Sequence, residues 1–89
     1  MTDYEKLCKE LAANDDGGYF KRKTITTLIE RVNRETRSLP EKLYIPEYEI
    51  SKEYFFEILT KLGYNYTWEE EYNSYFEQYC LKVTLSTSS

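Results

Sequence analysis

The chain has 89 residues, of which 40% are hydrophobic and 31% are charged, and its formal net charge is −4. This length allows a single domain with one small core, and the apolar share excludes an intrinsically disordered chain. The sequence contains no histidine, which removes the commonest general base and the commonest metal ligand. We therefore expect the protein not to be an enzyme and to need no metal or cofactor.

The two cysteines, Cys8 and Cys80, are too far apart in sequence to form a zinc-binding Cys-x-x-Cys pair. The N-terminus lacks the basic and apolar segments of a secretion signal, and no apolar run approaches the ~20 residues needed to span a bilayer. These features predict a cytoplasmic protein with two free thiols and no membrane partner, with a bridge between Cys8 and Cys80 as the alternative.

Two helices are predicted in the first half. Thr2 and Glu5 have the spacing of a capping box at the start of the first helix. Apolar residues at helical spacing then define this helix: Tyr4, Leu7, Cys8, Leu11 and Ala12. Residues 14–18 then favour a turn. The second helix is predicted from Thr24, as N-cap, to about Thr36, while Tyr19 to Lys23 is ambiguous.

A connector follows, in which Leu43 to Ile45 suit an edge strand because Pro46 comes next. The third helix is predicted from an N-cap at Ser51 to a left-handed C-cap at Gly63. Alternation then predicts two strands, Tyr64 to Trp68 and Tyr79 to Leu85. Residues 69–74 between them are interpreted as an acidic hairpin tip.

These elements predict an α+β fold, with three helices packed on a small two- or three-stranded antiparallel sheet that ends in a C-terminal hairpin. The domain is expected to cover residues 1–85, with a flexible tail at 86–89. The order of the elements is similar to that of winged-helix proteins, a likeness of arrangement alone. The predicted core consists of Leu7, Leu11, Ile25, Leu28, Ile29, Val32, Phe55, Ile58, Leu59, Leu62, Tyr66, Leu81 and Val83.

The second half of the chain is acidic and aromatic: residues 46–79 hold eight acidic and only two basic residues, and the chain has ten tyrosines. Such a surface can dock onto a basic groove of another protein, as small phage-type inhibitors that mimic nucleic acid do. The first hypothesis is therefore a protein-binding module, an adaptor or an inhibitor. The residues expected to bind the partner are Glu53, Glu57, Trp68, Glu69, Glu70, Glu71, Tyr72, Tyr75 and Glu77. The alternative is that these residues form a solvated helix face and a solubilising hairpin without a partner.

Residues 19–44 are basic, with seven basic and three acidic residues. The second hypothesis is a nucleic-acid-binding module, since basic side chains neutralise phosphates and aromatic rings stack on bases. The residues expected to act in it are Lys21, Arg22, Lys23, Arg31 and Arg34. A homodimer is a further possibility, because opposite charges on one small body can pair head to tail.

Overall fold

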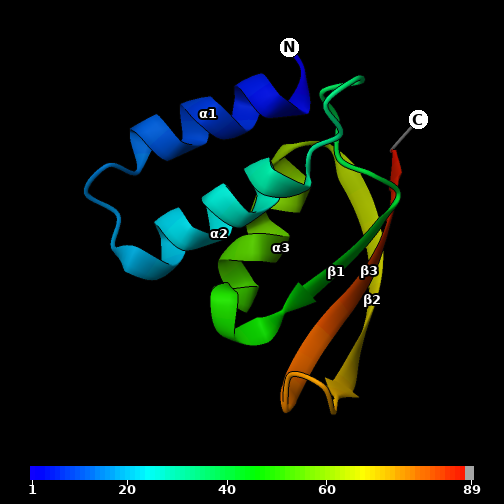
Figure 1. Cartoon of the computed structure of the whole chain (residues 1–89). Coiled ribbons are helices and arrows are strands. Elements are labelled where there is room, and N and C mark those ends of the chain that lie inside the picture. The colour runs from blue at the N-terminus through cyan, green and yellow to red at the C-terminus, as the bar shows by residue number, and fades with distance from the viewer. Residues whose placement is uncertain (88–89) are drawn as a thin grey trace.

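The computed structural model describes residues 1–87. Three helices lie against one face of a three-stranded antiparallel sheet, so the α+β prediction is confirmed (Figure 1). Within residues 1–87, no helix lies on the other face of the sheet. The elements, in chain order, are α1 (Asp3–Ala13), α2 (Tyr19–Arg31), β1 (Lys42–Pro46), the 3-10 turn η1 (Glu47–Glu49), α3 (Lys52–Lys61), β2 (Tyr64–Asn73) and β3 (Gln78–Thr87).

Helix α1 begins as its sequence predicts. The Thr2 side-chain oxygen accepts the N–H of Glu5 at 3.2 Å, which satisfies one of the donors that a helix N-terminus leaves open. Asn14 ends the helix, and its side-chain amide donates to the Glu10 carbonyl oxygen at 2.8 Å. The single buried apolar side chain of α1 is that of Leu7, with Leu11 packed at the margin of the core.

Helix α2 starts and ends five residues earlier than predicted, so the expected N-cap at Thr24 is wrong. Thr24 is fully buried inside the helix, where its hydroxyl donates to the Phe20 carbonyl oxygen at 2.7 Å and accepts the N–H of Ser51 at 2.8 Å. The helix instead follows Gly18, whose φ of +83° is a conformation that suits glycine. After Arg31 the backbone becomes extended, and Val32 still packs against the core.

Helix α3 agrees closely with the prediction. It follows Ser51, although the Ser51 side chain makes no capping hydrogen bond, and it ends before Gly63, which has a φ of +89°. The backbone N–H of Gly63 donates to the Thr60 carbonyl oxygen at 3.0 Å. This left-handed residue turns the chain directly into β2.

The strand order is β1-β3-β2, so the last strand lies in the middle of the sheet. Strand β2 pairs with β3 over ten consecutive positions, from Tyr64 opposite Thr87 to Asn73 opposite Gln78. The expected acidic hairpin tip is therefore wrong: Glu69 to Glu71 lie within β2, and the turn consists of residues 74–77. Strand β3 also includes residues 86 and 87, which were expected in the tail, while residues 88 and 89 of that tail lie outside the described part.

All thirteen predicted core residues lie in the core or at its margin. Six further apolar side chains are buried there: Leu39, Leu43, Ile45, Ile50, Tyr54 and Leu85. Most of them come from the connector and β1, so this segment contributes more to the core than its irregular sequence suggests. Among the described helices, none is long and apolar enough to cross a membrane.

Candidate functional site

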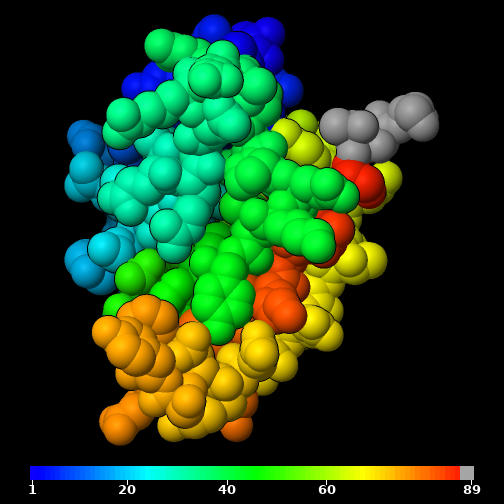
Figure 2. All heavy atoms as spheres, turned by 45° about the vertical axis from the view of Figure 1, so that its right-hand side comes forward, coloured from blue at the N-terminus to red at the C-terminus, as the bar shows by residue number. Residues whose placement is uncertain are grey.

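The β2–β3 hairpin extends beyond the rest of the fold. Strand β1 ends at Pro46, which pairs with Cys80, so on the turn side of Cys80 the only described strand that pairs with β3 is β2. We call residues 72–79, which form this projecting end, the arm. Figure 1 shows the arm reaching past η1 and the start of α3, and Figure 2 shows it as one end of the molecule.

The arm is aromatic and exposed. Its four rings keep large parts of their surface accessible: Tyr72 54%, Tyr75 86%, Phe76 52% and Tyr79 53%. They form two edge-to-face pairs, Tyr72 with Tyr79 at 5.3 Å and Tyr75 with Phe76 at 5.0 Å between ring centroids. None of the four belongs to the buried core cluster. Exposed aromatic side chains gathered in one place are typical of a contact surface.

Asn73 holds the turn of the arm in shape. Its side-chain oxygen accepts the N–H of Phe76 at 3.1 Å, and its amide donates to the hydroxyl of Tyr44 on β1 at 2.9 Å. Glu77 adopts a left-handed conformation with φ of +54°. The arm is thus a defined turn, linked to the neighbouring strand, although it has no core of its own.

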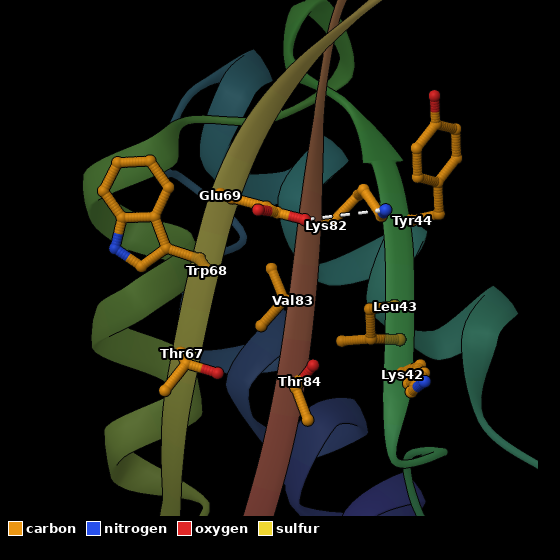
Figure 3. Close-up of a pocket in the computed structure, with 9 residues that line it drawn as sticks. All are labelled: Lys42, Leu43, Tyr44, Thr67, Trp68, Glu69, Lys82, Val83 and Thr84. Atoms are coloured by element: carbon orange, nitrogen blue, oxygen red, sulfur yellow. Dashed lines mark ion pairs between the residues drawn. The ribbon is translucent and has the colours of Figure 1, made fainter.

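The carboxylates that precede the arm divide between the two faces of the sheet. Glu69 and Glu71 lie on the face without helices, where Lys82 approaches them at 3.5 and 3.9 Å; Figure 3 shows the pair with Glu69. Glu70 lies on the helical face and contacts Lys52 of α3 at 3.6 Å. The three consecutive glutamates therefore do not form one acidic patch, because successive residues of a strand point to opposite faces.

Lys52 connects three elements at the base of the arm. Its amino group lies 3.8 Å from the Glu47 carboxylate, 3.6 Å from that of Glu70, and 4.2 Å from the centre of the Trp68 ring. Burial raises the pKa of Glu47, the neighbouring Glu70 carboxylate raises it further, and Lys52 opposes both effects. One lysine thus serves two carboxylates, which leaves this region acidic.

The Trp68 side chain is partly packed within the fold and partly exposed. Its ring packs on Phe56 of α3, with 5.4 Å between centroids, and Phe56 in turn stacks on Tyr66 at 4.8 Å. Its exposed fraction is nevertheless 45%. Trp68 therefore anchors β2 to α3 while it offers part of its indole to solvent.

The structure brings only some of the expected partner-binding residues together. Tyr72, Tyr75 and Glu77 lie in the arm, and Trp68 and Glu70 lie beside its base on the helical face. Glu53 and Glu57 are exposed on α3, with no described contact to the arm. Sequence reasoning missed Tyr79, which it named only as the first residue of the predicted strand from Tyr79 to Leu85. In the structure Leu81 is fully buried, whereas Tyr79 is 53% exposed.

The basic residues proposed for nucleic acid divide into two groups. Lys21, Arg22 and Lys23 lie at the start of α2, and Arg31 and Arg34 lie at or beyond its end. A helix of 13 residues is about 20 Å long, so the groups lie at opposite ends of it. Arg22 and Lys23 line a shallow hollow together with Asp15 and Asp16, which lowers the local positive charge.

No group of three or more potential metal ligands is found among residues 1–87. In the same part of the chain every buried side-chain polar atom has a hydrogen-bond partner. Both described cysteines are free thiols, with Cys80 buried and Cys8 partly exposed. No family model, curated protein or solved structure matches this chain.

Proposed function

We propose that this protein is a binding module that docks onto a basic surface of another protein through its aromatic arm. The observation that carries the proposal is the concentration of exposed rings: of the ten exposed large apolar side chains in the described part of the chain, five belong to residues 68–79. Rings held outside the core stabilise the fold little, whereas burying them against a partner is worth about 25 cal/mol for each Å² removed from water.

The charge around the arm supports a basic partner. Glu69, Glu70, Glu71 and Glu77 lie in or next to the arm, and Glu47 lies at its base, while the lysines that approach them are Lys52 and Lys82. These ion pairs are partly exposed, and such pairs contribute only about 0–1 kcal/mol each, so a partner cation can replace a lysine at small cost. Complementary charge would speed association and select the partner.

Nucleic-acid binding through Lys21, Arg22, Lys23, Arg31 and Arg34 stands as the competing proposal. Winged-helix proteins place a recognition helix in the major groove, and here the corresponding α3 exposes Glu53 and Glu57, which would repel phosphate. The separation of the basic residues along α2 further favours the protein-binding proposal.

The test is affinity capture from lysate of the source organism with three proteins: the wild type, an arm variant and a control. The arm variant carries Y72S, Y75S, F76S and Y79S. The control carries Y19S and F20S, which removes another exposed edge-to-face ring pair at the start of α2. We expect the wild type and the control to retain the same protein after nuclease treatment. The arm variant should lose it by about 30-fold or more, the effect of one strong interface residue.

Equal capture by the arm variant would overturn the proposal. Capture of nucleic acid that is lost on nuclease treatment would favour the basic residues of α2 instead. Circular dichroism would establish that all three proteins are folded alike.

A further inference from the structure

The outer edge of β2 is long and unpaired. In the order β1-β3-β2 this strand is at the end of the sheet, and no described strand pairs with its other side. Its ten residues pair with β3 without a bulge, so the edge is regular over its whole length. Such an edge presents a row of backbone N–H and C=O groups that can pair with another extended chain.

The opposite edge of the sheet is much less suited to strand addition. Strand β1 has five residues and ends at Pro46, which has no N–H to donate. β2 is twice as long and contains no proline.

The sequence of β2 opposes pairing between two copies of this protein. An antiparallel pair related by a two-fold axis near Glu70 would bring Glu70 opposite its own copy and Glu69 opposite Glu71. Like charges directly opposite each other destabilise a sheet. Glu70 also points to the helical face, and an inward-pointing charge is one device by which edge strands avoid self-association. The charges on β2 thus disfavour its pairing with β2 of a second copy, but they allow its pairing with a positively charged strand.

The two faces of β2 define which side chains an added strand would need. On the face without helices, Glu69 and Glu71 have Lys82 on the β3 side only, so basic side chains of an added strand would lie on their other side. On the helical face, Figure 3 shows the Trp68 ring projecting from β2 away from β3. Apolar side chains of the added strand would meet this half-exposed ring.

We propose that the edge of β2 accepts, as a fourth strand, an extended segment of the partner protein in which basic residues alternate with apolar ones. This inference rests on the proposed function as a protein-binding module. Backbone pairing would supply a general affinity, and the alternating carboxylate and indole contacts would supply selectivity.

The test uses a fluorescent peptide that alternates lysine and valine, titrated with the full-length protein at low salt. We expect saturable binding by fluorescence anisotropy, and amide protection along residues 64–73 by NMR. The variant E69K/E71K should weaken binding by about tenfold, as expected for the loss of two exposed ion pairs. The control E30K/E35K, with the same change in charge at two exposed positions in α2 and the loop after it, should bind as the wild type does.

Two N-methylated peptides separate strand addition from simple charge attraction. Each carries N-methyl groups on alternate residues, so that one loses the N–H groups of one peptide edge and the other loses those of the opposite edge. Strand addition requires that one of them binds and the other does not. Equal binding of both, or no binding of the parent peptide, would overturn the inference. If the arm variant still loses its captured protein while the peptide fails to bind, the proposed function stands and only strand addition falls.

Discussion

Asp3 shows how one buried carboxylate can tie together three distant parts of the chain. Its Oδ2 accepts the backbone N–H of Leu39 at 3.0 Å and the hydroxyl of Tyr64. The helix α1, the connector before β1 and the first residue of β2 therefore meet at a single oxygen. Burial, and after it the hydrogen bond to Asp3, raise the pKa of Tyr64 to about 12.

This contact predicts a pH dependence of stability. Tyr64 has a reference pKa of 10.0 and a folded pKa of about 12, so the unfolded chain loses this proton first as the pH rises. The contribution of the contact is therefore complete below pH 10 and is lost as the pH rises through 12. The variant Y64F lacks this contribution, so its free energy of unfolding should fall less steeply over that range. Urea unfolding of Y64F and of the wild type at a series of pH values would measure the difference.

Leu59 provides a second prediction, for the core. Its side chain is fully buried beneath the sheet, so L59A would remove apolar contacts and leave a cavity. We expect a loss of about 2–5 kcal/mol in the free energy of unfolding, a large fraction of the stability of a small domain. Chemical denaturation would measure it, and L11A, at the margin of the core, should cost less. A change in melting temperature of only a degree or two would contradict the position of Leu59.

Among the elements, those with a clear periodicity and clear end signals could be predicted from sequence. The first and third helices and the strand at residues 43–45 follow this rule. The boundaries of α2 could not be predicted, because Thr24 has a low helix propensity and favours caps. Its burial and its hydrogen bond to Ser51, a residue 27 positions away, outweigh that preference.

The candidate site was predictable in its composition but not in its shape. Three consecutive glutamates have low strand propensity, so the sequence favoured a turn. In the structure Lys82 lies directly opposite Glu69 on the paired strand and also reaches Glu71, which stabilises the strand there. The turn is therefore formed by residues 74–77 and not by residues 69–74, and the aromatic rings beside it lie at the end of the molecule. This cross-strand contact depends on the pairing register, which periodicity alone does not specify.

The conformation of Gly63, which connects α3 to β2, should contribute to the stability of the fold. Its φ of +89° strains any residue with a Cβ, although no neighbouring atom would block one. G63A should therefore lower the free energy of unfolding by about 1–2 kcal/mol, through backbone strain alone. G63N should cost less, because asparagine tolerates left-handed conformations better. Thermal unfolding of the two variants would measure the difference, and equal stability of G63A and wild type would contradict this explanation.

Removal of the arm should abolish partner binding without unfolding the protein. Replacing residues 72–79 by a two-residue Asn-Gly turn would remove the four exposed rings and the contact of Asn73 with Tyr44. Because no arm residue belongs to the core cluster, we expect the melting temperature to fall by less than about 8 °C, equivalent to about 1 kcal/mol. Capture of the partner should be lost. Global unfolding of the shortened protein would show that the arm is part of the folding unit.

For the whole molecule, charge is distributed unevenly: α2 and the loop after it are basic, whereas η1 and the β2–β3 hairpin are acidic. The triple reversal E69K/E70K/E71K should slow association with the captured partner and flatten its dependence on salt, since the Debye length is about 8 Å at physiological ionic strength. Stopped-flow or surface-based kinetics at several salt concentrations would measure both effects. The variant E30K/E35K/E41K changes the net charge equally at the other end and should leave the association rate nearly unchanged.

The position of the arm outside the core also has an evolutionary consequence. Substitutions in residues 72–79 would change what the protein recognises while leaving nearly all of the packing around Phe55, Leu59 and Leu81 intact. The arm could therefore diverge quickly under selection from a changing partner, whereas the body would diverge slowly. Homologues of this protein should then differ most in these eight residues, and a library randomised there would yield folded proteins with new specificities.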